Sequence, residues 1–292
     1  MLYFFIVLFF IIIYKMSQKE SDISNEALKI DVEGIISNKN PKLLRIIPRF
    51  LINYLKRIIH QDEVNEFLAN NSDKFGLDFS QAIIDNFSVN HDYKGLDNIP
   101  EDGRYIFAAN HPLGGMDGIV FLTVVGQKFP NIKFPVNDIL TYLRHLNNIF
   151  LPINKHGGHS KEAFQAIEDA YESDNQMLMF PAGMVSRKIK GEITDLEWKR
   201  SFIKKSIQHK RDIVPVFITG QNTNFFYNLA KWRGRLGIKA NLEMLFLSDE
   251  LFKQRGKTVS LKFGKPIPWQ TFTKEKTYDE WANDVKKVVY SL

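Results

Sequence analysis

Short apolar runs alternate with amphipathic segments along most of the chain. Runs at 105–109, 131–136 and 212–220 are apolar and rich in β-prone residues, and they predict buried strands. Segments between such runs carry helical patterns, as at 161–171. Because alternation of strands and helices is typical of layered proteins, we expect an α/β fold: a single domain with a central mixed sheet flanked by helices, plus an N-terminal amphipathic helical element.

The segment 41–60 has one basic and one apolar helical face. Its polar side chains recur at helical spacing, the other face is Leu, Ile, Phe and Tyr, and Pro48 predicts a kink. Such a helix lies either in the interface of an anionic membrane, where each basic residue contributes on the order of 1 kcal/mol, or on the protein core as an ordinary surface helix. The basic residues expected at a membrane are Lys42, Arg45, Arg49, Lys56 and Arg57.

Residues 1–14 are continuously apolar. As a helix they would extend roughly 21 Å, against about 30 Å of bilayer hydrocarbon, and they lack the basic leader and cleavage site of a secretory signal. They are a shallow anchor, an end that packs on the protein, or the product of a start assigned upstream of Met16. We expect three regions: the apolar stretch 1–15, a helical region 16–88 with the basic helix, and an α/β domain 89–292.

Composition limits the chemistry further. The net charge of +6 suits nucleic acid, anionic lipid or an acidic carrier. Because the basic residues of 41–60 lie among apolar ones and no groove-reading module is recognised, we expect no nucleic-acid partner. The chain has no cysteine, which excludes disulfides, thiolate zinc sites and a cysteine nucleophile. His156 and His159 have no third ligand nearby, so we expect no metal.

The stretch 109–118, ANHPLGGMDG, places a histidine and an aspartate around a flexible turn at the exit of a predicted strand. His111 and Asp117 are six residues apart, a spacing that puts them on different faces of a helix. The proline and two glycines between them instead favour a chain that folds back, so that the carboxylate approaches the imidazole. An imidazole held by a carboxylate is a base suited to deprotonating an alcohol. The alternative is that Asp117 caps the following helix and His111 fills a loop.

The stretch 177–187, MLMFPAGMVSR, repeats this arrangement of an apolar strand followed by a turn with proline and glycine. Such a turn lets backbone groups and polar side chains face a substrate. Arg187, Lys188 and Lys190 come next, and they either bind an anionic group or form a solvated loop. Ser186 lacks the Gly-x-Ser-x-Gly elbow of a nucleophile.

The first of these stretches resembles the signature of the glycerolipid acyltransferase superfamily, the relatives of lysophosphatidic acid acyltransferase. Asn110-His111 followed by Asp117 carries the likeness, with five residues rather than the usual four between the histidine and the aspartate. This Gly-rich form resembles the branch often described as hemolysin-like or lyso-ornithine-lipid acyltransferase.

The remaining motifs follow in family order, over roughly 89–268. The second stretch is similar to the family's Phe-Pro-Glu-Gly-Thr-Arg block, with Phe, Pro and Gly retained and the Glu, Thr and Arg replaced by Ala182, Met184 and Val185. The Val-Pro-Val run at 214–216 and the Lys-Pro-Ile-Pro run at 265–268 also match.

The resemblance implies acyl transfer from acyl-CoA or acyl carrier protein to a hydroxyl of a lysolipid, without a cofactor or an acyl-enzyme. In the family the histidine, here His111, is the general base and the aspartate, here Asp117, orients it. Loss of the block's arginine favours a lyso-amino-acid lipid of the ornithine or glycine type over lysophosphatidate. The residues expected at the substrates are Asn110, Gly114, Gly115, Lys155, Phe180, Pro181, Gly183, Ser186, Arg187 and Lys188, with amides near the glycines as donors to the oxyanion.

We expect such a protein at the cytoplasmic face of the cell membrane, peripheral or shallowly anchored. Two other functions remain open from the sequence. A lipid or thioester hydrolase would use the same histidine and aspartate on water. A basic membrane-binding protein would retain the scaffold without catalysis.

Overall fold

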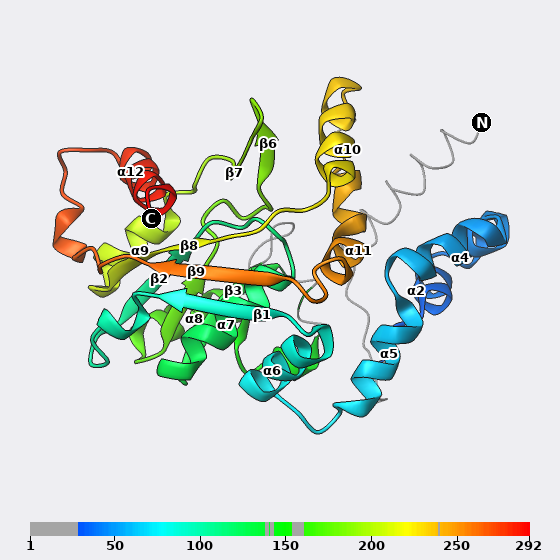
Figure 1. The fold of residues 1–292 in the computed structure, drawn as a ribbon, viewed down its shortest axis with the longest axis horizontal. Coiled ribbons are helices and arrows are strands. Elements are labelled where there is room, and N and C mark those ends of the chain that lie inside the picture. The colour runs from blue at the N-terminus through cyan, green and yellow to red at the C-terminus, as the bar shows by residue number, and fades with distance from the viewer. Residues whose placement is uncertain (1–28, 138–139, 141–142, 154–160, 239) are drawn as a thin grey trace. The chain divides into compact units, whose positions relative to one another are not determined.

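The computed structural model describes residues 29–137, 140, 143–153, 161–238 and 240–292 (Figure 1). The apolar stretch 1–14 and Lys155 lie outside the described residues. The described residues form two compact units, the first within 29–74 and 223–253 and the second within 75–222 and 254–292. The sequence expectation of a region 16–88 followed by a domain 89–292 did not anticipate that 223–253 groups with the N-terminal region.

The second unit is built on a mostly parallel sheet. Within the described residues seven strands follow the order β1-β9-β8-β2-β5-β3-β4, and every pair is parallel except β8 with β9. The predicted α/β class with a mixed central sheet is therefore confirmed. The strands are β1 (Asn90–Lys94), β2 (Tyr105–Ala109), β3 (Ile132–Asn137), β4 (Phe150–Ile153), β5 (Gln176–Met179), β8 (Asp212–Ile218) and β9 (Thr258–Phe263).

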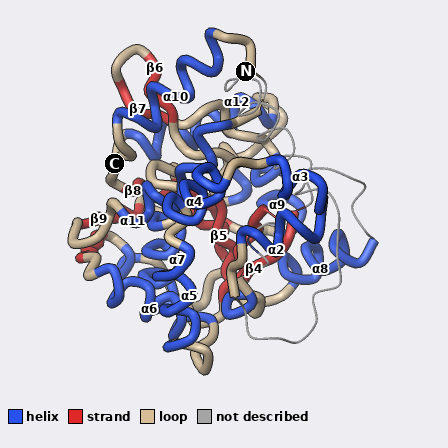
Figure 2. Tube along the Cα trace, turned by 90° about the vertical axis from the view of Figure 1, so that its right-hand side faces the viewer, coloured by secondary structure: helices blue, strands red, loops and turns tan. Residues whose placement is uncertain are grey.

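Helices cover both faces of this sheet because its strands are apolar on both sides. All five side chains of β2 are buried, and alternate ones point to opposite faces. Ile106 and Ala108 pack with residues of α8 (Lys161–Glu172), α9 (Ser201–His209) and α12 (Tyr278–Tyr290). Phe107 faces the other way and contacts Phe129 at the end of α7 (Met116–Lys128), which packs on α6 (Gly76–Phe87). In Figure 2, β5 and β4 accordingly lie between α7 on one side and α8 and α9 on the other.

A short hairpin follows β5 and its turn. It consists of β6 (Arg187–Ile189) and β7 (Glu192–Thr194), which pair antiparallel. The two residues between them, Lys190 and Gly191, have φ of 52° and 95°, the left-handed backbone that a two-residue hairpin turn requires. The hairpin therefore reverses the chain, and Asp195 follows directly after β7. The second unit also contains the 3-10 turns η1 (Leu96–Asn98), η3 (Arg144–Leu146) and η5 (Trp269–Thr271).

The first unit is helical. Pro48 separates two helices rather than kinking one, since a proline cannot continue the hydrogen-bond ladder of the preceding turn. The apolar sides of these helices form a small core with Phe246, and Leu229 packs against it. Among the described residues, no helix combines the length and the apolar character needed to cross a membrane. The helices are α2 (Val32–Lys39), α3 (Pro41–Ile46), α4 (Arg49–Ile58), α5 (Gln61–Asn70), α10 (Asn224–Arg235), η4 (Leu242–Phe246) and α11 (Leu247–Phe252).

Candidate functional site

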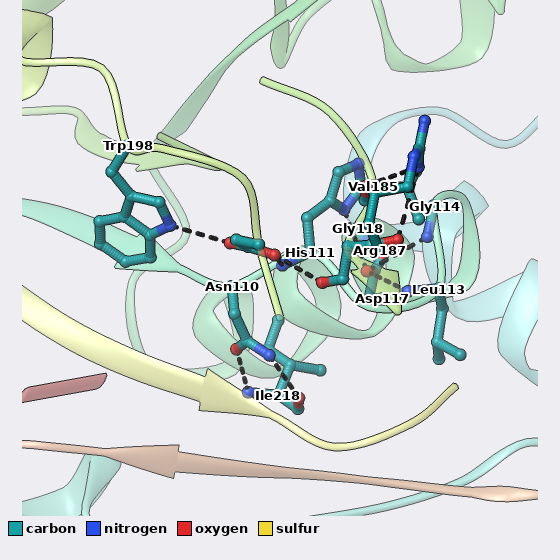
Figure 3. Close-up of polar contacts among 12 residues, drawn as sticks. Asn110, His111, Leu113, Gly114, Asp117, Gly118, Val185, Arg187, Trp198 and Ile218 are labelled. Carbon is teal, nitrogen blue, oxygen red and sulfur yellow. Dashed lines mark hydrogen bonds and ion pairs between the residues drawn. The ribbon is translucent and has the colours of Figure 1, made fainter. Parts of the chain in front are cut away.

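The turn after β2 brings a histidine and an aspartate together, as the spacing predicts. Gly114 has a φ of 90°, which glycine adopts without the strain of a side chain, and the chain reverses there before α7 begins. As a result, Nδ1 of His111 lies 3.0 Å from Oδ2 of Asp117 (Figure 3). The pair stands at the carboxyl end of a central strand of the sheet.

Asp117 is fully buried and holds the turn as well as the histidine. Its Oδ2 accepts hydrogen bonds from the amides of Leu113 at 2.8 Å and Gly114 at 3.2 Å, and its Oδ1 accepts from the amide of Gly118 at 2.8 Å. The residue lies in the first turn of α7, where the helix dipole favours a negative charge. The helix cap itself is Gly115, so Asp117 is not the cap that the alternative interpretation proposed.

The second motif supplies one wall of the site. β2 and β5 are parallel neighbours, so the turns that follow them emerge at the same edge of the sheet. Phe180, directly after β5, stacks on the ring of His111 with centroids 3.8 Å apart and planes 16° from parallel. With Nδ1 facing Asp117 and one face covered, the ring has Nε2 as its remaining polar atom. No described residue is hydrogen-bonded to Nε2, and the side chain of His111 retains 14 % exposure.

The backbone around His111 is fixed by bonds to distant segments. The side chain of Asn110 donates to the carbonyl of Ile218 at 2.9 Å and accepts from its amide at 2.7 Å, which ties the motif to β8 (Figure 3). The carbonyl of His111 accepts from the amide of Ser186 at 2.8 Å. The amide of His111 donates to Oδ1 of Asp195 at 3.2 Å.

Asp195 is a member of the site that the sequence did not reveal. It is 1 % exposed and also accepts hydrogen bonds from the hydroxyl of Ser186 at 2.5 Å and from Nε1 of Trp198 at 2.9 Å. Its amide donates to the hydroxyl of Tyr290 at 2.7 Å. Burial and the charge of Asp195 raise the pKa of Tyr290 to about 12, so this phenol is neutral near pH 7. A single aspartate in a polar stretch carries no local pattern, and only the tertiary fold shows its role.

The other residues that the sequence predicts at the substrates differ in burial and in the hydrogen bonds they form. Gly183 has a φ of 62° and its amide donates to the carbonyl of Phe180 at 2.9 Å, while the carbonyl of Pro181 accepts from the amide of Lys199 at 3.0 Å. Arg187 is 9 % exposed, and its Nη1 donates to the carbonyl of Val185 at 2.7 Å (Figure 3). Lys188 is exposed on β6.

These bonds bear on the amides expected to stabilise an oxyanion. The amide of Gly114 donates to Asp117 and that of Gly183 donates to Phe180. Of the three glycines named from the sequence, Gly115 is the one whose amide has no acceptor among the described residues. Within the part of the chain that the structure describes, no group of three or more His, Asp or Glu residues is placed to hold a metal ion.

Comparison with known proteins gives three findings. The family model described as "Acyltransferase" matches residues 34–292. Two curated proteins named lyso-glycine lipid O-acyltransferase are similar over 264 residues: one from Bacteroides thetaiotaomicron is 50% identical, covering 90% of this chain and 97% of that protein, and one from Phocaeicola vulgatus is 48% identical, covering 90% and 95%. The crystal structure of the 1-acyl-sn-glycerophosphate (LPA) acyltransferase PlsC from Thermotoga maritima aligns at 19% identity and a TM-score of 0.45, over 98% of this chain and 94% of that one.

Proposed function

Because the chain belongs to the acyltransferase family, we propose that it transfers a fatty acyl group from acyl-CoA or acyl carrier protein to the hydroxyl of a lysolipid. The chain is an acyl-transferring enzyme; the donor, the acceptor and the catalytic residues are the proposal. The observation that carries it is the geometry of His111, whose Nδ1 faces a buried carboxylate while Nε2 has no partner among the described residues.

The proposed reaction needs no covalent intermediate on the enzyme. Nε2 of His111 takes the proton of the acceptor hydroxyl as its oxygen attacks the thioester carbonyl, and Asp117 stabilises the imidazolium that forms. The tetrahedral intermediate then collapses, the C–S bond breaks, and the imidazolium returns its proton to the departing thiolate. The products are the O-acylated lipid and the free thiol of the carrier.

The oxyanion of the intermediate needs a hydrogen-bond donor. Gly115 is at the N-cap of α7, where amides have no partner within the helix, and its own amide has no acceptor among the described residues. We assign this amide to the oxyanion, because donors fixed in advance at a helix N-terminus stabilise developing negative charge without reorganisation.

The proposed acceptor is a lyso-amino-acid lipid of the glycine type. Two observations support this choice over lysophosphatidate. The relatives that are about half identical are named for a lyso-glycine lipid. The position of the family block's arginine holds Val185, which is 1 % exposed, and the nearby Arg187 directs Nη1 to a backbone carbonyl.

An assay of the purified protein with three acceptors tests this assignment. We expect lyso-glycine lipid to be acylated with a kcat/KM at least about tenfold above that of lyso-ornithine lipid or lysophosphatidate, because groups that hydrogen-bond one headgroup are left unpaired by another. Product is measured by mass spectrometry, and free thiol is measured in parallel. Acylation of lysophosphatidate alone would overturn the acceptor, and thiol release that is independent of any acceptor would indicate a hydrolase.

We further propose that α3 and α4 bind the membrane that holds the acceptor, at the cytoplasmic face where the donors are found. Arg45 and Arg49 are exposed beside Ile46 and Phe50, which are 61 % and 60 % exposed, so cationic and apolar groups share one surface. Lys42 and Arg57 are exposed too, whereas Lys56 forms an ion pair with Glu33.

Flotation of the full chain with vesicles tests this surface. We expect binding to vesicles of phosphatidylcholine with phosphatidylglycerol, and at least about thirtyfold weaker binding after the double change R45E and R49E, since each of the two lost charges near an anionic surface contributes about 1 kcal/mol and the new carboxylates are repelled. Equal binding of both proteins would show that this surface is not the membrane contact.

A further inference from the structure

We propose that Asp195 is a positioning residue for acyl transfer, acting with Ser186 as a clamp on the backbone of His111. This inference rests on the proposed function, since it requires His111 to be the base. It concerns a residue from a different part of the chain, 84 residues from the histidine in sequence.

The clamp holds His111 from both sides of the residue. On one side the amide of His111 donates to Oδ1 of Asp195 at 3.2 Å, and on the other its carbonyl accepts from the amide of Ser186 at 2.8 Å. Because Ser186 also donates its hydroxyl to the same Oδ1, the three groups form a closed ring of hydrogen bonds. Neither peptide group of His111 can rotate without breaking this ring.

The carboxylate is itself held by a rigid surround. Oδ2 of Asp195 accepts from Nε1 of Trp198, which is 2 % exposed and packs against Phe202. The backbone of Asp195 is tied to α12, because its amide donates to Tyr290 and its carbonyl accepts from Nζ of Lys286 at 2.7 Å. The clamp therefore anchors the backbone of His111 to the core through Trp198 and α12. It does not depend on the position of the exposed hairpin.

This arrangement has a specific chemical purpose. Asp117 and Phe180 fix the orientation of the imidazole, but they leave the position of its Cα to the backbone. A base must lie within hydrogen-bond reach of the proton it removes, and a displacement of about 1 Å costs roughly a hundredfold in rate. Ser186, which the sequence suggested as a substrate contact, is 1 % exposed and turned to Asp195, so its hydroxyl acts on the histidine rather than on a substrate.

Two buried serines provide a matched test. The hydroxyl of Ser186 is bonded to Asp195, and that of Ser206, on α9, is bonded to the carbonyl of Arg211 at 2.7 Å; the residues are 1 % and 0 % exposed. S186A and S206A therefore each remove one buried hydroxyl, and S186A removes the bond to Asp195 together with a hydrogen bond to the side chain of Tyr290. We expect similar losses of Tm, a fall in kcat of about 3- to 30-fold for S186A with KM for donor and acceptor within about twofold, and unchanged kinetics for S206A.

Replacement of the carboxylate extends the test. D195A removes the whole ring, and we expect kcat to fall by at least about a hundredfold; D195N keeps one acceptor oxygen and should restore part of that loss. If D195A does not fold, the comparison of S186A with S206A tests the clamp by itself.

Three outcomes would overturn the clamp: unchanged kcat in S186A, equal loss of kcat in both serine variants, or a rise in KM alone, which would make Ser186 a substrate contact. If the wild-type protein transfers acyl groups while S186A is unaffected, the clamp fails and the proposed function stands. If H111A is as active as the wild type, the proposed function itself fails.

Discussion

Two histidines of the second unit are paired with carboxylates in nearly the same way. Nδ1 of His111 lies 3.0 Å from Asp117, and Nε2 of His209 lies 3.2 Å from Glu168. Each imidazole also stacks on an aromatic side chain. The distance to a carboxylate and the stacking therefore do not distinguish a base from a structural histidine.

The difference lies in what else the carboxylate binds. Besides the imidazole, Asp117 accepts hydrogen bonds from backbone amides of its own turn. Glu168 is shared with the ammonium of Lys205. Burial, followed by the positive charge of Lys205, lowers the pKa of His209 and so disfavours the imidazolium that a base has to form.

The solvent exposure of the imidazole also differs between His111 and His209. The side chain of His209 is 5 % exposed, compared with 14 % for His111. A third pair, His60 with Asp249 in the first unit, resembles His209 in its shared carboxylate, because Lys253 lies 2.6 Å from Asp249, although the side chain of His60 is 26 % exposed. Among these three histidines of the described chain, His111, the proposed base, is the one whose carboxylate has no cation recorded on it.

The largest expected effect comes from removing the histidine of each pair. H111A should lower kcat/KM by about 100- to 10,000-fold, the usual contribution of a general base, and D117N should also lower it strongly because the imidazolium loses its counter-charge. H209Q and E168Q should leave kcat/KM within about twofold of the wild type, since that pair lies outside the proposed site. Steady-state kinetics at 25 °C, with circular dichroism to verify folding, provide the measurement. A large loss of activity in H209Q without unfolding would erase the distinction between the pairs.

A smaller effect than these changes in activity is expected on the pH dependence of the free energy of unfolding, through the titration of His209. Because the pKa of His209 is lower in the folded protein than its unfolded value of about 6.5, the unfolded chain binds more protons in that range. Above about pH 6.5 His209 is neutral in both states, and its titration takes nothing from the free energy of unfolding. As the pH falls through this value towards the folded pKa, protonation of the unfolded chain lowers the free energy of unfolding. H209Q should therefore flatten the fall in the free energy of unfolding between pH 7.5 and 5, by at most about 1.4 kcal/mol per pH unit.

Urea unfolding at several pH values measures this slope. S206A, a buried change on the same helix without a titrating group, provides the control, and it should lower stability while keeping the wild-type slope. An identical slope in wild type and H209Q would mean that His209 titrates alike in both states, contrary to the comparison.

The sequence predicted the parts of the site that depend on local interactions. The strand 105–109 and the approach of Asp117 to His111 follow from an apolar run and a glycine turn within ten residues, and both are present. The likeness to the acyltransferase superfamily is confirmed by the family match over 34–292. The position of the interruption at Pro48 was likewise foreseeable, because proline acts on its own turn, but the predicted kink is a break between two helices.

Other features depend on strand order and could not be predicted in this way. Asp195 reaches His111 only because the chain between them forms β5 beside β2 and then a hairpin that reverses it. The grouping of 223–253 with the N-terminal region depends on Phe246 and Leu229 packing with α4, and neither residue differs locally from one in any other amphipathic helix. The roles of Lys155 and the other substrate contacts stay predictions.

The bond between Asn110 and Ile218 joins residues that are 108 positions apart in the chain. During synthesis at about 5–20 residues per second, the histidine and aspartate leave the ribosome roughly 5–20 s before the strand that secures them. Contacts of such long sequence separation also slow folding, because the loop must close before the contacts form. The nascent protein therefore carries its complete pair of proposed reactive groups well before the fold that aligns them, and in the proposed mechanism the pair is aligned only after β8 has been made.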